Sequence, residues 1–296
     1  MKFLRQLAGR LRRPSEAPRV PPKDASEDYS NPDQFSSLCP ETAFVFTTFQ
    51  RDEISTHSFL SLSEALQDFR KRVKIVVCDA TLAPDKAQFF VENGADDVLW
   101  TPTFVSAATQ RNLCLELIRD KYSNEYICFL EDDYEYTKAW YPALLRACRE
   151  HFGRMSPWGM PYGMFSASNH RFQKERVKED PATGLIAAFH GTVADQRMLP
   201  MSHYEAVLRF WDPDLLGVSF CQTGMQTSRH AMRGFCGGIL PSEDLCWEIP
   251  EQKSMWRGGR RDVGPLPHSM NPQDYNAVRK ATLKKVTYQK KGIPSK

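Results

Sequence analysis

The sequence lacks the features that mark several large classes of protein. It contains no run of about 18 apolar residues, so no transmembrane helix is expected, and its N-terminus lacks the apolar core of a secretory signal. The net charge of +3 is too small to indicate nucleic acid as a partner. We therefore expect a cytoplasmic protein, which could still bind peripherally to a membrane.

The cysteines lack the spacing of a metal or redox motif. None of the eight forms a C-x-x-C pair, and several lie inside apolar runs, as Cys78 does in Val-Val-Cys and Cys128 in Ile-Cys-Phe. Thiols in such runs are typical of the reduced core of a cytosolic protein rather than of a disulfide framework. The sequence thus predicts buried free thiols.

Residues 1–40 differ in composition from the rest of the chain. In residues 1–13, apolar side chains recur at helical spacing, and the Lys and Arg residues fall largely off that stripe. A basic amphipathic helix of this kind can rest on an anionic membrane surface, although a frayed tail or a helix packed on the domain fits the same pattern. Residues 14–40 are rich in proline among polar residues, which is typical of a linker or an extended arm.

After the linker, strand-like and helix-like segments alternate. Short apolar runs indicate strands buried on both faces, and longer segments with apolar residues at every third or fourth position indicate helices. Four such alternations predict an α/β domain with a doubly wound, mostly parallel central sheet. The predicted strands are 43–49, 73–78, 98–100 and 126–130, and the predicted helices are 55–72, 85–93, 106–121 and 138–152.

The second half of this domain is less regular, and the chain after it is polar. We expect strands at 164–168 and 185–189, helices at 202–210 and 227–232, and a tight loop at Gly234, Gly237 and Gly238. The predicted organisation is an N-terminal segment and linker (1–40), a domain (41–250) with two halves (41–137 and 138–250), and a polar, basic C-terminal tail (251–296).

Polar side chains follow three of the predicted strands where each strand ends. Gln50 to Asp52 follow the first strand, Asp79 follows the second, and Glu131, Asp132 and Asp133 follow the strand at 126–130. Ligands of an open parallel sheet bind beyond the carboxyl ends of its strands. We therefore expect the functional site at this edge.

The three adjacent carboxylates at residues 131–133 indicate a metal site. They repel one another without a cation, and Mg²⁺ or Mn²⁺ takes oxygen ligands while leaving positions open for substrate phosphates. A nucleotide diphosphate would supply the remaining ligands. The alternative is an acidic loop that caps the following helix, which explains one carboxylate well and three poorly.

The segment from Phe44 to Asp133 resembles the nucleotide-binding half of inverting GT-A glycosyltransferases, above all the large family-2 group. Four elements carry the resemblance in order along the chain. They are the segment Thr47 to Arg51 after the first strand, Asp79 after the second, the helix start Ala-Ala-Thr-Gln-Arg-Asn, and the D-x-D-like Glu-Asp-Asp after an apolar strand. The family often has a second aspartate beside the one at Asp79, whereas this chain has Cys78 before it.

The resemblance implies the GT-A fold of nucleotide-diphospho-sugar transferases and a donor site with defined roles. Asp79 would accept a hydrogen bond from the base of the donor, for which a UDP-sugar is the expected ligand. Glu131 and Asp132 would hold the ribose and the donor sugar, and Asp133 would ligate Mn²⁺ or Mg²⁺. The other donor-site residues that the resemblance implies are Thr47, Arg51 and Arg111.

A second constellation, Ser242-Glu243-Asp244, follows Gly237 and Gly238. In inverting family members a similar Glu-Asp step supplies the general base, which is required because an acceptor hydroxyl is a poor nucleophile until a carboxylate takes its proton. The resemblance therefore implies that Asp244 is the catalytic base, with the adjacent Glu243 as the second candidate for that role. The alternative is a cap for a helix that runs through Trp247.

His268 is a second candidate metal ligand. It lies in Pro-Leu-Pro-His-Ser-Met near the C-terminus, and some GT-A enzymes recruit a late histidine to the metal. A solvent-exposed loop histidine is the simpler interpretation of the same residue.

The function expected from these features is metal-dependent transfer of a hexose or N-acetylhexosamine from a nucleotide diphosphate to a hydroxyl, with inversion. The acceptor would be a glycan, a lipid-linked sugar or a protein. One alternative is a nucleotidyltransferase that makes nucleotide sugars, although the segment Thr47 to Glu53 lacks the glycine-rich loop usual in such enzymes. The other alternative is a degenerate GT-A domain that binds a glycan or a partner without catalysis.

Overall fold

The computed structural model of this protein describes residues 42–49, 52–80, 84–100, 107–167, 177–188, 196–209, 222–241, 244–249 and 287–288. The predicted N-terminal amphipathic segment, the proline-rich linker and nearly all of the C-terminal tail lie outside these residues. Within the described ranges, no helix is long and apolar enough to cross a membrane.

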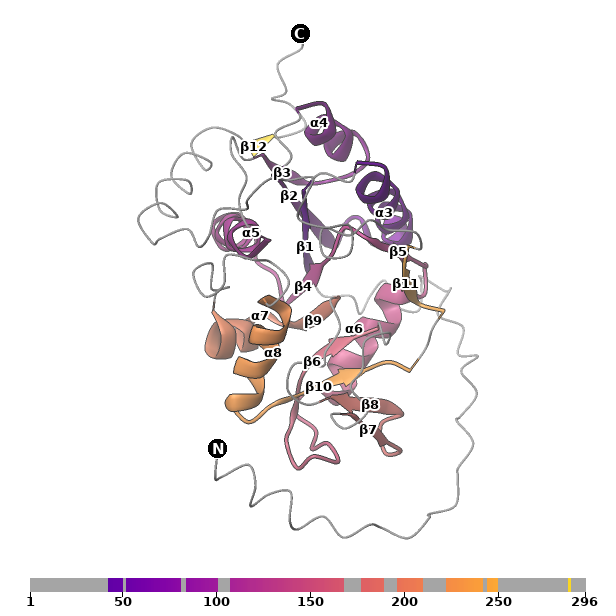
Figure 1. Cartoon of the computed structure of the whole chain (residues 1–296), viewed down its shortest axis with the longest axis vertical. Coiled ribbons are helices and arrows are strands. Elements are labelled where there is room, and N and C mark those ends of the chain that lie inside the picture. The colour runs from indigo at the N-terminus through magenta and orange to yellow at the C-terminus, as the bar shows by residue number, and fades with distance from the viewer. Residues whose placement is uncertain are drawn as a thin grey trace, which may run out of the picture.

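The order of strands and helices follows the predicted alternation through the first half of the domain (Figure 1). The strands are β1 (Thr42–Thr48), β2 (Val73–Asp79), β3 (Asp97–Trp100), β4 (Tyr126–Leu130), β5 (Tyr134–Tyr136), β6 (Tyr162–Ser166), β7 (Val177–Asp180), β8 (Leu185–Ala188), β9 (Arg197–Pro200), β10 (Cys236–Ile239), β11 (Cys246–Glu248) and β12 (Thr287–Tyr288). The helices are α3 (Asp52–Ala65), η1 (Gln67–Phe69), α4 (Pro84–Glu92), α5 (Ala107–Lys121), α6 (Trp140–His151), α7 (Met201–His203), η3 (Tyr204–Leu208) and α8 (Gln222–Met232).

Ten of the described strands form one sheet in the order β12-β3-β2-β1-β4-β9-β6-β10-β8-β7. The strands β3, β2, β1 and β4 are parallel, as predicted from their continuous apolar runs. Beyond β4 the sheet is mixed, because β9 runs antiparallel between β4 and β6, whereas β10 is parallel to β6. The predicted α/β fold with a doubly wound sheet is thus confirmed.

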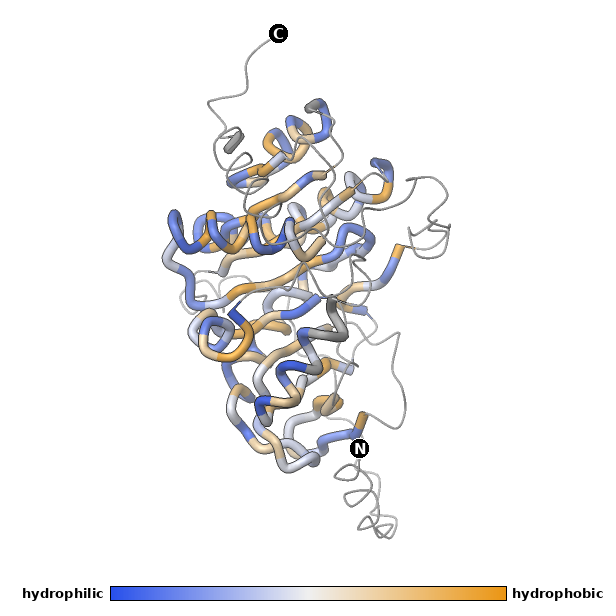
Figure 2. Tube along the Cα trace, turned by 60° about the vertical axis from the view of Figure 1, so that its left-hand side comes forward, coloured by the Kyte–Doolittle hydropathy of each residue, from blue (hydrophilic) through white to orange (hydrophobic). Residues whose placement is uncertain are grey.

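Helices cover both faces of this sheet because successive side chains of a strand point to opposite faces, and both sets are apolar. Phe44 and Phe46 of β1 pack with α3, α4 and α6 on one face, whereas Ala43 and Val45 pack with α5 and η3 on the other. Figure 2 shows the central strands mostly in orange and tan, while the outer helices alternate between blue and orange. The two faces form separate apolar clusters, and this three-layer arrangement positions the strand ends.

The predicted buried thiols are confirmed for the cysteines that the structure describes. Cys78, Cys114, Cys128, Cys148, Cys236 and Cys246 are all free and buried. Burial raises the pKa of the Cys78 thiol, and a hydrogen bond with Cys114 raises it further. Although Cys78 lies next to Asp79 at the end of β2, its thiol therefore stays protonated and is a poor nucleophile.

One local prediction is wrong: Gly237 and Gly238 lie in strand β10 rather than in a tight loop. β10 lies between β6 and β8, and a Cβ atom on Gly238 would come within 3.0 Å of the ring of Phe165. A glycine suits this position because the neighbouring strand carries a large aromatic ring that leaves little room for a side chain, not because the chain turns. Gly234 has a φ of 87° and does form the turn between α8 and β10.

A pair of buried histidines joins α7 and α8 over β6. The Nε2 atoms of His203 and His230 lie 3.1 Å apart, and a Cβ atom on Gly163 would come within 2.3 Å of His230 Nε2 and 2.7 Å of His203 Nε2. Burial lowers the pKa of His203 to about 4, and burial together with the neighbouring imidazole lowers the pKa of His230 to about 3. Both rings are therefore neutral at pH 7.

This pair predicts a loss of stability in weak acid. The unfolded chain binds protons at these histidines near pH 6.5, whereas the folded chain does not until about pH 4, so the free energy of unfolding should fall as the pH drops from 7 to 4. Urea unfolding at pH 7.5, 6 and 5 measures this slope. The double variant His203→Gln/His230→Gln cannot titrate and should give a flatter slope whatever its absolute stability. An unchanged slope would assign the acid sensitivity to other groups.

Candidate functional site

The carboxyl ends of β2, β1 and β4 lie side by side and bring the predicted site residues to one edge of the sheet. Thr48 of β1 is in register with Asp79 of β2, and Phe46 with Leu130 of β4. The acidic turn Glu131–Asp133 follows β4 directly, between β4 and β5. The convergence expected from the strand ends is therefore present in the structure.

The three carboxylates of the acidic turn have different surroundings. Glu131 forms an ion pair with Arg111, whose side chain is only 2% exposed. Asp132 is buried and accepts a hydrogen bond of 2.8 Å from the Thr48 hydroxyl. Asp133 is half-buried on the turn, and its backbone carbonyl accepts a hydrogen bond from Ile249. Part of the repulsion that suggested a metal is thus relieved by protein groups at Glu131 and Asp132.

Arg111 reaches the acidic turn because the start of α5 is polar and buried. Thr109, Gln110, Arg111 and Asn112 are all buried, unlike the polar residues at the end of this helix. A buried guanidinium is retained only where it has a charged partner, and Glu131 is that partner. The helix-start motif of the sequence thus lies at the site, with its arginine directed at the acidic turn.

Thr47 and Asp79 lie at the strand ends that form the site, beneath its surface. Both side chains are buried, and Asp79 is fully so. Because β1 alternates its side chains between the two faces, Thr47 faces away from the side on which Thr48 contacts Asp132. Of the residues predicted for this site, Arg51, Glu243 and His268 lie outside the described residues.

Lys86 is a site residue that sequence reasoning missed. It lies in the first turn of α4, and its Nζ atom is 3.2 Å from the Thr48 hydroxyl, 3.0 Å from Asp52 Oδ1 and 4.0 Å from Asp79 Oδ1. One local feature of the sequence could have indicated it. A cation at the N-terminus of a helix opposes the helix dipole, so a lysine there suggests a carboxylate nearby.

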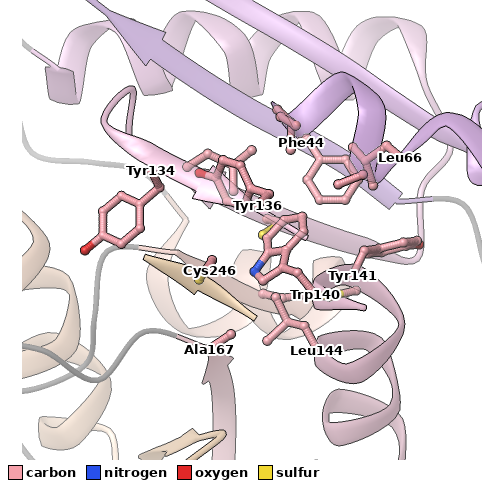
Figure 3. Packing of buried hydrophobic residues seen from close by; sticks show 14 of the residues in the cluster. Phe44, Leu66, Tyr134, Tyr136, Trp140, Tyr141, Leu144, Ala167 and Cys246 are labelled. Atoms are coloured by element: carbon pink, nitrogen blue, oxygen red, sulfur yellow. The ribbon is translucent and has the colours of Figure 1, made fainter. Parts of the chain in front are cut away.

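The segment after Asp244 forms strand β11, which lies beside the strand that follows the acidic turn. β11 pairs antiparallel with β5, with Cys246 opposite Tyr136 and Glu248 opposite Tyr134. Figure 3 shows Cys246 beside Tyr136 and Trp140 in the core beneath this ribbon. The predicted alternative of a helix cap is therefore wrong, because the residues after Asp244 extend along β5 rather than coil.

The register fixes where Asp244 lies on this ribbon. Leu245 accepts hydrogen bonds from the backbone and the hydroxyl of Thr137, and Ile249 donates to the carbonyl of Asp133. Asp244 is exposed in the turn before β11, at the end of the ribbon away from Asp133. The half-buried Glu248 lies nearer to the acidic turn.

Polar contacts of Glu135 hold the outer face of the same ribbon. The Glu135 carboxylate lies 3.4 Å from His57 Nε2 of α3 and accepts a hydrogen bond of 3.2 Å from the Trp247 indole. On the inner face, burial raises the pKa of Tyr136, whose hydroxyl donates to the carbonyl of Glu131. The ribbon is thus anchored on both faces beside the acidic turn.

No protein-family model and no curated protein matches this sequence, whereas solved structures do. Residues 1–349 of TarS from S. aureus align at 13% identity over 82% of this chain and 70% of that chain, with a TM-score of 0.51. The TarS 1–349 complex with UDP-GlcNAc aligns at 13% identity over 82% and 71%, with a TM-score of 0.54. This chain spans only 43% of a longer TarS chain.

A mannosyltransferase gives a similar match. PcManGT from Pyrobaculum calidifontis, in complex with GDP-Man and Mn²⁺, aligns at 12% identity over 86% of this chain and 74% of that chain, with a TM-score of 0.54. At such identities the likeness concerns the fold. The chain therefore has the GT-A α/β fold of these glycosyltransferase structures.

Proposed function

We propose that this protein is a glycosyltransferase that moves a sugar from a nucleotide-diphosphate donor to a hydroxyl. The observation that carries the proposal is the convergence of Asp79, the acidic turn Glu131–Asp133 and Arg111 at the carboxyl edge of a GT-A sheet. Ligands of open α/β sheets bind at such an edge. A basic residue beside an acidic turn suits a donor that carries both a diphosphate and sugar hydroxyls.

The donor we propose is a UDP-sugar, with a GDP-sugar as the second choice. Two structural neighbours are complexes with UDP-GlcNAc and GDP-Man, and both bases carry a ring N–H from which a carboxylate can accept a hydrogen bond. Asp79 is the carboxylate at the end of β2 where that N–H would bind. Thr47 and Arg51 would complete the nucleotide site, and Glu131 and Asp132 would contact the ribose and sugar.

The side chains around the acidic turn could give a divalent cation, Mn²⁺ or Mg²⁺, few protein ligands. Among the described residues no group of three His, Cys, Asp or Glu side chains is arranged to hold an ion. Asp133, to which the family resemblance assigns the metal, would be the principal protein ligand, with His268 as a second candidate. Such a cation takes its other ligands from the diphosphate and water, and it would supply charge stabilisation to the leaving diphosphate.

The reaction we propose is a single displacement with inversion. An acceptor oxygen bonds to the anomeric carbon of the donor sugar as the bond from that carbon to the diphosphate oxygen breaks. The acceptor proton moves to a carboxylate of the second constellation, for which Asp244 is the first candidate and Glu243 the second. Arg111 stabilises negative charge near the acidic turn. The acceptor would be a glycan, a lipid-linked sugar or a protein.

Two other functions are less well supported. A nucleotidyltransferase would need a glycine-rich loop after β1, and the sequence from Thr47 to Glu53 contains no glycine. A binding domain without catalysis is less well supported because the acidic turn Glu131–Asp133 is intact in the sequence. Residues 1–13 remain a candidate for peripheral contact with a membrane that carries the acceptor.

The metal assignment predicts the behaviour of Asp133→Asn. The variant keeps the shape of the side chain and removes its charge, so the Mn²⁺-dependent part of UDP affinity should fall by about tenfold or more, which corresponds to about 1.4 kcal/mol. Calorimetric titration of UDP with Mn²⁺ and with EDTA measures this difference. Glu135→Gln is the matched control, because it lies two residues further on and points to the outer face. Equal Mn²⁺ dependence in wild type and Asp133→Asn would rule out the assignment.

The base assignment predicts a separation of rate from donor affinity. Asp244→Asn removes a proton acceptor, so the transfer rate should fall by about 10²–10⁴-fold, while UDP affinity should barely change because the base acts on the acceptor. Glu243→Gln should have a smaller effect. The measurement is the transfer rate on an acceptor identified by screening glycan, lipid-linked and protein substrates.

Glu248→Gln provides a comparison within the same segment, since the register places Glu248 nearer to the acidic turn. A slow Glu248→Gln beside a near-normal Asp244→Asn would move the role to Glu248. Near-normal rates in all three variants would exclude this segment as the source of the base.

A further inference from the structure

Lys86 lies at the N-terminal end of a helix, a position that is unfavourable for a positively charged side chain. It is in the first turn of α4, where the helix dipole repels a positive charge, and its side chain is only 4% exposed. Removing an ammonium group from water is strongly unfavourable unless it is paired and hydrogen-bonded. A lysine therefore persists here only because of the groups that it contacts.

Those contacts connect two parts of the proposed donor site. The Lys86 ammonium lies 4.0 Å from Asp79 Oδ1 and 3.2 Å from the Thr48 hydroxyl, and the same hydroxyl donates to Asp132 Oδ2 at 2.8 Å. One short chain of polar contacts thus runs from the carboxylate at the end of β2 to the acidic turn after β4. Asp52, which is 65% exposed, contacts Lys86 from the solvent side at 3.0 Å.

The ammonium determines what kind of hydrogen-bonding group Asp79 is. Asp79 is fully buried, and burial alone favours a neutral carboxylic acid, which can both donate and accept. A cation within about 4 Å favours the ionised form instead. An ionised carboxylate only accepts hydrogen bonds, so Lys86 makes Asp79 an acceptor before any base arrives.

That difference matters for which nucleobase can bind. Uracil and guanine present a ring N–H beside a carbonyl on the edge used for pairing, whereas cytosine and adenine present a bare ring nitrogen at the same place. An acceptor-only carboxylate pairs with the N–H and repels the lone pair of the bare nitrogen. A neutral carboxylic acid could pair with either edge.

We propose that Lys86 is the specificity-determining residue of the donor site, because it holds Asp79 as an oriented anion that selects nucleotides with an N–H on the base edge. This inference rests on the proposed function, in which Asp79 contacts the base. Lys86 acts through Asp79 and is a positioning residue. Thr48 extends its influence to the acidic turn, so the base and the sugar-diphosphate are aligned by one network.

The test measures dissociation constants for UDP, GDP, CDP and ADP with Mn²⁺ by calorimetry. The wild-type protein should bind UDP or GDP at least about tenfold more tightly than CDP and ADP, because mismatched polar groups in a buried site weaken binding. In Lys86→Met the ratio should fall below about threefold, through weaker UDP or GDP binding and relatively stronger CDP binding. Lys86→Arg keeps the cation and should retain the discrimination.

Two further variants separate selectivity from folding. Lys74→Met is the matched control, because Lys74 is a lysine of β2 itself that contacts a carboxylate, that of Asp96, at 4.0 Å but at the opposite end of the strand from Asp79. Its ratio should equal that of wild type. Asp79→Asn/Lys86→Met removes both charges of the pair, so it keeps the test available if Lys86→Met does not fold. Its amide both donates and accepts, so it should also lose the discrimination.

The outcomes distinguish this inference from the proposed function. If the wild type discriminates between the bases and the folded Lys86 variants keep the same ratio, the inference is overturned and the proposed function stands. If the wild type binds all four nucleotides equally, the inference is again overturned while nucleotide binding stands. If the wild type binds none of them, the proposed function and the inference fail together.

Discussion

Buried carboxylates at the carboxyl edge of the sheet have to be paired, and this requirement governs how the elements around that edge are arranged. An uncompensated buried charge would be expelled or neutralised. Three elements bring the compensating groups: α5 brings Arg111, β1 brings Thr48 and α4 brings Lys86. The positions of these helices therefore depend on charge pairing at the strand ends as well as on apolar packing along the sheet faces.

The same edge is joined to the second half of the domain by the ribbon of β5 and β11. Its inner face buries Tyr134, Tyr136 and Cys246 in the same apolar cluster as Trp140 and Phe44, as the close view of the core shows (Figure 3). Because β5 follows the acidic turn directly, packing of this ribbon restrains the turn. A site that needs carboxylates at fixed positions gains from such support, since catalytic groups act only when they are held in place.

Groups of the protein itself compensate two of the three carboxylates in the acidic turn. Three carboxylates in a row suggest a cation, but Glu131 is paired with Arg111 and Asp132 with Thr48. The protein thus compensates two of the carboxylates with its own groups. In the proposed function, Asp133 is the principal contact for an ion that enters with the diphosphate.

The sequence by itself determined the first half of the fold and the location of the site. Continuous apolar runs and amphipathic periodicity are local properties, so they gave β1 to β4 and the positions of their helices, and the carboxyl ends of parallel strands had to meet. The helix expected at 55–72 differs most, since α3 ends at Ala65 and the short helix η1 follows it. That Asp79 and the acidic turn are neighbours followed from the same reasoning, whereas Arg111 was expected there only from the resemblance to family-2 glycosyltransferases.

Only the tertiary structure decided the mixed part of the sheet and the partners within the site. The glycines of β10 were expected in a loop, whereas Gly238 lies against Phe165 of β6, which is distant in sequence. The strand β11 pairs with β5, more than a hundred residues earlier, so a helix cap stood as the alternative for its start. Lys86 was not singled out because its contacts come from three other elements. Strand pairing and burial of charge depend on residues far apart in the chain, so a lysine in the first turn of a helix indicates that a carboxylate lies nearby but not which one.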